Sequence, residues 1–443
     1  MDYGKGKSIS QQLNRTVNLQ RILNIIAIVF FIFVIFGGVT ILSPLRKQLL
    51  IAGSCFCLLS FIVANMKLRA LNSISFLWFI SISYMAFGSF LSQYSNNAIP
   101  YFISYACCFV VMITGFSKDD YILFIKIDEV VAVIAAITRI LEVVIQPLFT
   151  NILSFIYPAG NRAKRIQMIT SEIHQGSYSG FLGEKGEAAF AMNILVSIEL
   201  CKMFAKKSTD RISVFLLMLG IISLMLTGKR TLFIIPFFIC VLFVLVNKIK
   251  GKYIKIAVAA CIVALTFYVA ILAIPQAGNI FNRLFESNDN TLSGRDVLWD
   301  ACSQINSRNP LFGTGLGTFT DWANNIPSVK TLAAMQGFES WTAQAHSMYY
   351  QFYAELGIIG SILVIGTIGF VLTNTILFKS KIPLMNLQQK IIYHFSLYFQ
   401  VWFVIYGLTG NVGHYPQDLI IYFMSVGMYL YVSYALSPLG KQD

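Results

Sequence analysis

The sequence predicts an all-α polytopic membrane protein with about 12 transmembrane helices and one large external loop. Hydrophobic residues make up 56% of the 443 residues and charged residues only 12%, whereas soluble domains carry about 25% charged residues. The apolar residues form runs of roughly 20, the helix length that crosses a bilayer. This composition excludes a water-soluble enzyme, a disordered chain and a collagen-like fibre. We therefore expect a single transmembrane bundle over residues 1–443.

Twelve apolar stretches account for this bundle. The first follows a polar segment, 1–21, and lacks a small-residue cleavage site, so we expect a retained span and not a signal peptide. Most stretches have the length of one crossing, and the two longer ones can tilt or include a surface segment. The predicted spans are 22–42, 49–65, 73–92, 99–117, 121–149, 186–205, 212–227, 231–247, 256–274, 347–378, 391–409 and 417–436.

The basic residues orient these spans. A net charge of +13 in a soluble protein would suggest nucleic acid, but here the Lys and Arg lie between apolar runs, so we expect no nucleic-acid partner. With the N-terminus inside, the inner segments carry more Lys and Arg than the outer ones, most clearly at 202–211 and 248–255. Both termini are then cytoplasmic, and the longest loop, 275–346, between spans nine and ten, lies outside.

The loop 275–346 is the expected place for chemistry, because loops of this length are usually functional or disordered. It contains Trp299, Trp322 and Trp341, so we expect it to pack as short helices on the outer mouth of the bundle. Seven of the eight Cys lie in or beside apolar runs and only Cys302 lies in the long polar stretch. No CxxC or His/Cys spacing is present, so we expect neither a disulfide nor a metal site.

Arg residues outside the membrane need a reason, because the positive-inside rule disfavours them. The planar guanidinium binds phosphate bidentately, so a cluster of external Arg suggests a lipid phosphate or pyrophosphate. The alternative is that each Arg reaches the headgroups separately. The external Arg residues are Arg162, Arg165, Arg230, Arg283, Arg295 and Arg308.

Two of these residues stand in fixed positions. Arg230 lies in the turn Thr-Gly-Lys-Arg-Thr at 227–231, between two predicted spans that hold it near the outer interface. Arg295 falls in the first turn of a helix predicted over 293–303, with Ser293 as its cap, and helix N-termini also favour anions. The alternative for Arg295 is a surface ion pair with Asp296 or Glu286.

The sequence after this helix combines a glycine-rich turn with a histidine at a membrane interface. Residues 309–317 read Asn-Pro-Leu-Phe-Gly-Thr-Gly-Leu-Gly, and we expect Gly313 and Gly315 to let the backbone approach another segment closely. His346 opens the tenth span, where a neutral imidazole can accept a proton from a hydroxyl; a purely structural histidine is the alternative. Glu355, nine positions later, should not pair with His346 on a regular helix.

Span five carries charges inside the predicted membrane region. Asp128, Ala132, Ala135, Arg139 and Glu142 fall on one stripe of a helix. Intramembrane charges face the bundle interior and are functional candidates, although a structural ion pair is the alternative. The spacing of three residues predicts that Arg139 and Glu142 pair.

Read together, these motifs resemble the superfamily of O-antigen ligases and O-antigen repeat-unit polymerases. The resemblance rests on Thr-Gly-Lys-Arg at 227–230, Ser-Gly-Arg at 293–295, Pro-Leu-Phe-Gly-Thr-Gly-Leu-Gly at 310–317, and Ala-His-Ser at 345–347 before Glu-Leu-Gly-Ile-Ile-Gly. It implies a GT-C-like glycosyltransferase of the bacterial cytoplasmic (inner) membrane. Such an enzyme uses polyprenyl-pyrophosphate-linked sugars at the outer face without a metal or cofactor, the lipid being a substrate carrier.

The resemblance also implies roles for single residues. Arg230 and Arg295 would hold the pyrophosphate, and His346 would act on the acceptor hydroxyl; Ser347 replaces the Asn that often follows this histidine in the family. We expect further pyrophosphate contacts from three other Arg residues, and we expect four residues near the site to support its structure. These are Arg162, Arg165 and Arg139 for binding, and Trp299, Gly313, Gly315 and Glu355 for support.

The function that we expect is polymerisation of O-antigen or capsular repeat units with inversion at the anomeric carbon. The expected partners are lipid-linked oligosaccharide, membrane lipids, a flippase and a chain-length regulator. One alternative is a ligase that transfers finished polymer to lipid A core. Another, of a different class, is a lipid-linked oligosaccharide flippase, although carriers tend to show internal repeats and discontinuous central helices.

Overall fold

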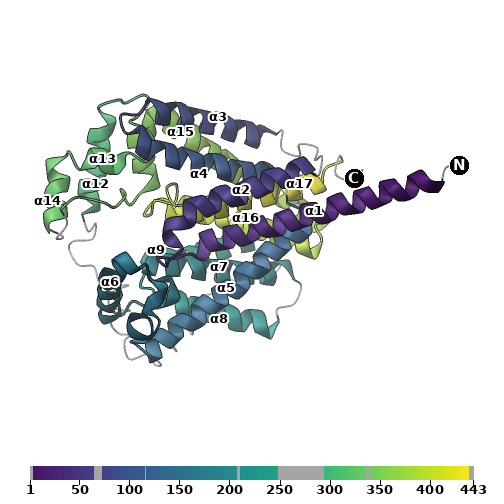
Figure 1. The fold of residues 1–443 in the computed structure, drawn as a ribbon, viewed down its shortest axis with the longest axis horizontal. Coiled ribbons are helices and arrows are strands. Elements are labelled where there is room, and N and C mark those ends of the chain that lie inside the picture. Colours follow the sequence, from purple (N-terminus) through teal and green to yellow (C-terminus); the bar gives the residue numbers. More distant parts are fainter. Residues whose placement is uncertain are drawn as a thin grey trace.

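The computed structural model describes residues 3–63, 72–114, 116–206, 210–247, 294–335 and 339–438. In these residues the chain is helical and contains no strand, which confirms the predicted all-α class. Long helices run side by side as one bundle, and short helices gather at one end of it (Figure 1). The two termini lie at the other end.

Each predicted span in the described residues falls on a long helix, whereas the predicted span 256–274 lies outside those residues. The bounds differ most in the first span, predicted over 22–42, because its helix begins at Tyr3 and ends at Phe36, and span five, predicted over 121–149, ends at Val144. The bounds of the long helices are α1 (Tyr3–Phe36), α2 (Arg46–Val63), α3 (Ser73–Leu91), α4 (Ser95–Thr114), α5 (Lys118–Val144), α7 (Lys185–Ala205), α8 (Arg211–Met225), α9 (Arg230–Val246), α15 (Met348–Leu377), α16 (Leu387–Tyr406) and α17 (Pro416–Ala435).

Seven helical segments in this part of the chain are long and apolar enough to cross a membrane, so the protein is multi-pass. The predicted total of about twelve spans stays a prediction, because α8 and α9 are shorter than a full crossing and α5 and α16 are not among the seven. The seven segments are Leu19–Phe36, Ser43–Val63, Ser73–Leu91, Ser95–Thr114, Lys185–Ala205, Met348–Leu384 and Pro416–Ala435.

Side-chain caps begin several of these helices. Ser117 and Asp120 form a capping box at the start of α5, and Asn386 and Gln389 form another at the start of α16. Such boxes satisfy the backbone amides that a helix N-terminus leaves open. The carboxylate of Asp120 also accepts a hydrogen bond of 2.8 Å from the amide of Asn24, which ties α5 to α1.

The centre of the bundle is formed by α7, α16 and α17. About three quarters of the apolar stretches of α7 and α17 are buried (78% and 72%), compared with 39% for α3. Aromatic rings fill the space between the central helices; Trp402 lies 5.2 Å from Phe190 between ring centroids. By contrast, α3 exposes Phe87 and Phe90 by 60% and 61%, as expected for a helix that faces lipid.

The charged stripe of α5 is buried as predicted, but the predicted contact within it is wrong. Arg139 donates a hydrogen bond of 3.0 Å to the carbonyl of Ser223, and Glu142 accepts from the amides of Ser179 and Gly180 at 3.0 and 2.7 Å. No ion pair joins Arg139 to Glu142 in the described residues. The two amides of the segment before α7 take up the carboxylate, which the spacing along α5 could not reveal.

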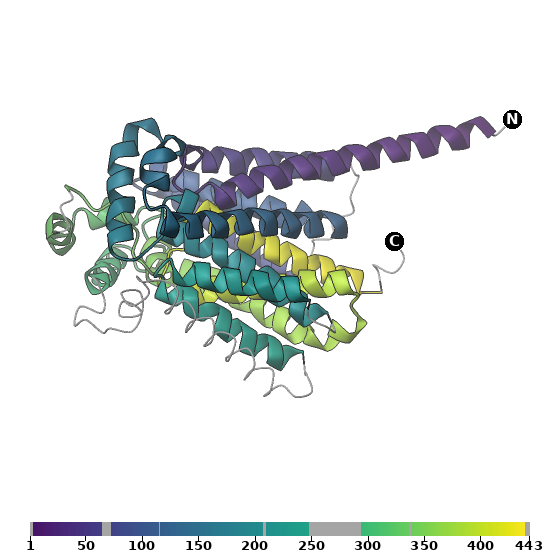
Figure 2. The same cartoon turned by 90° about the horizontal axis from the view of Figure 1, so that it is seen from below.

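Short helices cover the end of the bundle opposite the termini. They are α12 (Arg295–Asn306), α13 (Phe319–Ala323) and α14 (Pro327–Met335), and they share a small core that includes Leu298, Ile305 and Val329. The helix α6 (Arg162–His174) lies at the same end, as both views show (Figure 2). The residues that the sequence analysis singled out on these segments therefore share one end of the bundle.

Candidate active site

The turn between α8 and α9 is held rigidly. The hydroxyl of Thr227 donates to the carbonyl of Leu224 at 2.7 Å, and the amide of Tyr178 donates to the carbonyl of Leu226 at 2.9 Å. Lys229 is the residue before α9 and provides no side-chain cap for that helix. Its ammonium lies 3.9 Å from the carboxylate of Glu184. The turn thus fixes Lys229 at the N-terminus of α9. A positive side chain at a helix N-terminus favours the binding of an anion.

Arg295 is the first residue of α12, which makes it the second cation at a helix start. The helix begins one residue later than the predicted cap implied, because the capping position is Gly294 with a φ of 79° and no side-chain cap. Ser293, the predicted cap, lies outside the described residues. Arg295 is half-buried.

His346 stands immediately before the cap of α15 and not inside the helix. Its φ of 57° is the only positive value among the described non-glycine residues. Left-handed backbone is uncommon for such residues and is held only when the surroundings require it. The helix starts at Met348 with Ser347 as its cap, so His346 does not share a helical face with the following tyrosines.

The residues on both sides of His346 are fixed by hydrogen bonds. The indole of Trp299 donates to the carbonyl of Ala345 at 3.2 Å, and its ring stacks on Tyr350 at 4.9 Å between centroids. The amide of Met348 donates to the carbonyls of Gly407 and Gly410, both at 2.9 Å. The backbone on both sides of His346 is therefore fixed between α12 and the loop that joins α16 to α17.

The electrostatic surroundings keep this imidazole neutral. Desolvation by burial, followed by the positive charges of Arg295 and Lys229, lowers the pKa of His346 from 6.5 to about 4. The same effects place Arg295 and Lys229, from two separate segments, within electrostatic reach of one histidine. The site thus combines two cations with a neutral proton acceptor, which is the set of groups needed to bind an anionic leaving group beside a nucleophile.

A buried hydrogen-bond network lies behind His346. The carboxylate of Glu355 accepts from the amides of Gly317 and Phe319 at 2.7 and 3.0 Å, from Gln351 at 2.8 Å, and from Nε2 of His414 at 2.7 Å. Gln351 in turn accepts from the amide of Ala345 at 3.2 Å. Glu355 does not pair with His346; it fixes the segment that presents His346.

The helix α15 is broken at Gly357, where φ is 66° and ψ is −172°. The segment 310–313 fills the break: the amides of Ile358 and Ile359 donate to the carbonyls of Pro310 and Leu311, at 2.9 and 3.2 Å. The carbonyl of Glu355 accepts from the amide of Gly315 at 2.8 Å. Almost all buried backbone groups in proteins are paired, and here the loop supplies the partners that the break removes.

Two glycines make this contact possible. A Cβ on Gly313 would lie 2.3 Å from the carbonyl oxygen of Glu355, and one on Gly357 would lie 2.5 Å from that of Leu311. Both residues also have positive φ, which other residues rarely adopt. The glycine-rich turn therefore approaches the backbone of α15.

The remaining predicted binding residues are not among the charges that shift the pKa of His346. Arg230 is exposed at the start of α9, next to Lys229. Arg162 and Arg165 are half-buried in the first turns of α6, where Arg162 donates to the carbonyl of Tyr157 at 3.4 Å. Arg139 has no exposed surface. Its guanidinium is enclosed between helices and donates to a carbonyl, so a contact between Arg139 and pyrophosphate stays a prediction.

Sequence reasoning missed three members of the site: Lys229, Gln351 and His414. Lys229 is adjacent to Arg230, and the sequence of a turn does not tell which of two neighbouring cations acts on the histidine. His414 lies 59 positions from Glu355, in the loop before α17, and no spacing in the sequence connects the two residues. No group of three or more His, Cys, Asp or Glu side chains suited to a metal occurs in the described part of the chain.

A model of the O-antigen ligase family matches residues 214–365. The match supports the predicted resemblance to the O-antigen ligase and polymerase superfamily over this part of the chain. It covers most of α8, all of α9, α12, α13 and α14, and α15 as far as residue 365, and it includes Lys229, Arg295 and His346. It supports a membrane glycosyltransferase of the O-antigen ligase and polymerase type. No curated protein matches the chain.

Proposed function

We propose that the chain polymerises O-antigen or capsular repeat units that are carried on polyprenyl pyrophosphate at the outer face of the bacterial cytoplasmic membrane. Both termini are cytoplasmic in this proposal, and a flippase and a chain-length regulator are its partners. The observation that carries it is a neutral His346 beside two cations, Arg295 and Lys229, which come from separate segments at one end of the bundle.

In the proposed reaction a sugar hydroxyl of the acceptor attacks the anomeric carbon of the donor. The bond between that carbon and the pyrophosphate oxygen breaks as the new glycosidic bond forms, with inversion. The hydroxyl proton passes to the imidazole of His346. The electron pair of the broken bond stays on the leaving polyprenyl pyrophosphate, whose growing negative charge Arg295, Lys229 and the neighbouring Arg230 stabilise. The chemistry needs no metal in principle, because pyrophosphate is already a good leaving group.

A ligase is the second candidate, because the matching family is described as O-antigen ligase. It would use the same donor chemistry and transfer finished polymer to lipid A core. A flippase is less favoured. The break in α15 does not resemble the open discontinuous helix of a carrier, because the segment 310–313 fills it with backbone hydrogen bonds.

The test uses purified protein with a polyprenyl-pyrophosphate-linked repeat unit as both donor and acceptor, with and without a metal chelator. We expect longer lipid-linked glycans, one released polyprenyl pyrophosphate per bond formed, and no effect of the chelator. Failure to release the carrier under these conditions would contradict a glycosyltransferase that acts on it.

A deletion strain separates the two candidates. Loss of the polymerase leaves glycans of a single repeat unit, whereas loss of a ligase leaves long polymer on the lipid carrier. Long lipid-linked polymer in the deletion strain would replace the polymerase assignment with the ligase.

A further inference from the structure

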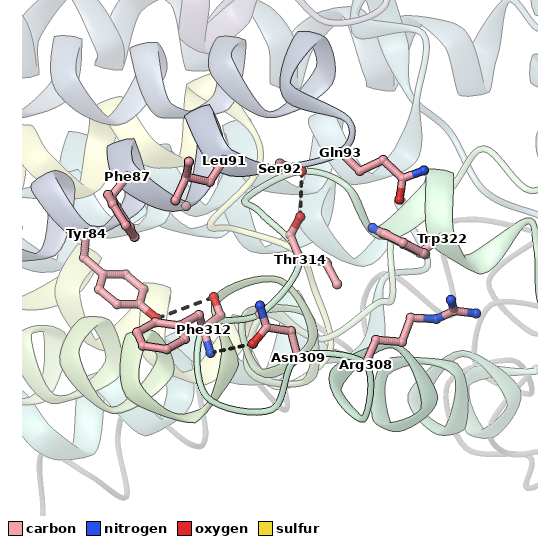
Figure 3. A pocket seen from close by; sticks show the side chains of 12 residues that line it. Tyr84, Phe87, Leu91, Ser92, Gln93, Arg308, Asn309, Phe312, Thr314 and Trp322 are labelled. Atoms are coloured by element: carbon pink, nitrogen blue, oxygen red, sulfur yellow. Dashed lines mark hydrogen bonds between the residues drawn. The ribbon is translucent and has the colours of Figure 1, made fainter.

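A pocket of about 460 Å³ lies between the end of α3 and the segment 308–314, away from His346. Figure 3 shows its wall. The apolar part consists of Tyr84, Phe87 and Leu91 from α3, facing Phe312. The polar part lies at the end of α3 and consists of Gln93, Arg308 and Asn309. Neither part belongs to the site around His346.

The pocket runs along α3 from polar to apolar surroundings. Tyr84 and Leu91 are seven residues apart on one helix, a rise of about 10 Å. Phe87, Leu91 and Phe312 are exposed by 60%, 68% and 50%, so the apolar part is open to the lipid side of the bundle. A ligand with both an alkyl chain and a polar head matches this gradient, whereas a free sugar or a soluble ion would leave the apolar part uncovered.

The polar part of the pocket carries a positive charge and therefore favours an anionic ligand. Among the described residues that line the pocket, Arg308 is the only charged side chain. It forms no ion pair in the described part of the chain, and its guanidinium carbon lies 4.8 Å from the ring centroid of Trp322. The nearby carboxylate of Asp321 does not line the pocket and accepts a hydrogen bond of 2.8 Å from Asn97.

An unused donor lies in the same wall. The indole N–H of Trp322 is buried and has no hydrogen-bond partner in the described residues. Buried donors in native structures are usually paired, and an unpaired one needs an explanation. The donors on the surface of the pocket are the side chains of Arg308, Gln93 and Asn309, which suit the oxygens of a phosphate ester.

We propose that this pocket binds an anionic glycerophospholipid of the outer leaflet, with the phosphate at Arg308 and an acyl chain along Tyr84, Phe87 and Phe312. The bound lipid would hold the segment 308–314 against α3, where the hydroxyl of Ser92 already donates to the carbonyl of Thr314 at 2.6 Å. The same segment fills the break in α15, so the lipid would stabilise the element that presents His346. This inference does not depend on the proposed reaction.

The test measures quenching of Trp322 by brominated lipids in vesicles of phosphatidylcholine that contain a small, equal fraction of brominated phosphatidylglycerol or brominated phosphatidylcholine. The signal of Trp322 is the difference between the wild-type protein and Trp322→Phe. We expect about fivefold stronger quenching by the brominated phosphatidylglycerol, the effect of one basic residue at a membrane surface. The preference should disappear in Arg308→Gln and persist in Lys330→Gln, which changes an exposed cation on α14.

Two variants and two competitors make the result decisive. Phe312→Ala should weaken quenching by both lipids, because it removes part of the wall for the chain. Equal quenching by the two lipids in the wild-type protein, or a preference that survives in Arg308→Gln, would overturn the proposal. Loss of the preference on adding inorganic phosphate would instead indicate a free-anion site. Loss on adding a soluble repeat-unit oligosaccharide would indicate a glycan site, and either result also overturns the lipid assignment.

Discussion

At the scale of single residues, the surroundings of His346 determine its protonation state. An exposed imidazole is half protonated near pH 6.5. Burial and the charges of Arg295 and Lys229 lower the pKa of His346 to about 4, so the ring is neutral at physiological pH and can accept a proton. The same cations that would bind a pyrophosphate therefore also keep the base in its active form.

This coupling predicts the pH dependence of turnover. A base is lost when it is protonated, so activity should fall only as the pH drops towards about 4 and should stay level through the neutral range. Arg295→Gln removes a positive charge, raises the pKa of His346 and should move the acid limb to higher pH. The check is the pH profile of kcat/KM, with Lys330→Gln as the control that leaves the limb in place. A wild-type limb near pH 6.5 would contradict this account of the electrostatics.

The sequence predicted part of this arrangement. The positions of Arg295 at a helix start and of His346 at a helix boundary could be predicted, because capping residues and apolar runs indicate where helices begin. Lys229 was not, because Lys229 and Arg230 are adjacent in the turn and only the folded backbone decides which charge acts on His346. The pairing of Glu355 with His414 was also out of reach, because α15 and the loop before α17 meet only in the folded bundle.

At the scale of elements, the contact between the segment 310–313 and the broken helix α15 holds the site together. Gly357→Ala would place a Cβ 2.5 Å from the carbonyl of Leu311, in a left-handed conformation that costs roughly 1–3 kcal/mol in itself. We expect a clearly lower melting temperature and faster proteolysis of the segment 308–314. Gly366→Ala in the same helix meets nothing within 4 Å and should be neutral or slightly stabilising. Equal melting of both variants would show that the contact is unimportant.

Glu355 provides a second test of this element. Its carboxylate accepts four hydrogen bonds, so Glu355→Gln turns an amide NH₂ towards groups that are themselves donors. Leaving buried donors unpaired costs about 1–3 kcal/mol each. We expect lower thermal stability together with reduced turnover, because Gln351 connects Glu355 to the segment that holds His346. Wild-type stability in Glu355→Gln would exclude this role.

The break in α15 could not be predicted from the sequence. The run 347–378 is predominantly apolar and indicated one continuous span. A glycine within such a run is tolerated in a straight helix, and only the backbone of the segment 310–313, more than forty residues earlier, forces the left-handed conformation at Gly357. The helices without such a partner, such as α3 and α17, end within about a residue of their predicted limits.

At the scale of the whole molecule, the orientation in the membrane decides whether the site can meet a lipid-linked glycan that has already been exported. The short helices and the termini lie at opposite ends of the bundle. Ser328 on α14 and Ser380 after α15 are both exposed and lie beyond opposite ends of the long helix α15. In a background without the native cysteines, Ser328→Cys should react with a membrane-impermeant maleimide in intact cells, and Ser380→Cys only after permeabilisation. The reverse pattern would contradict the external site.

The central claim is that His346 accepts the proton of the acceptor hydroxyl at this outer end. The most direct measurement is the turnover of purified His346→Ala with a polyprenyl-pyrophosphate-linked substrate, compared with His174→Ala, which changes an exposed histidine at the end of α6. General base catalysis contributes about 10²–10⁴-fold. We predict a loss of that size in His346→Ala, with unchanged melting temperature, and wild-type turnover in His174→Ala. Wild-type turnover in His346→Ala would contradict the account.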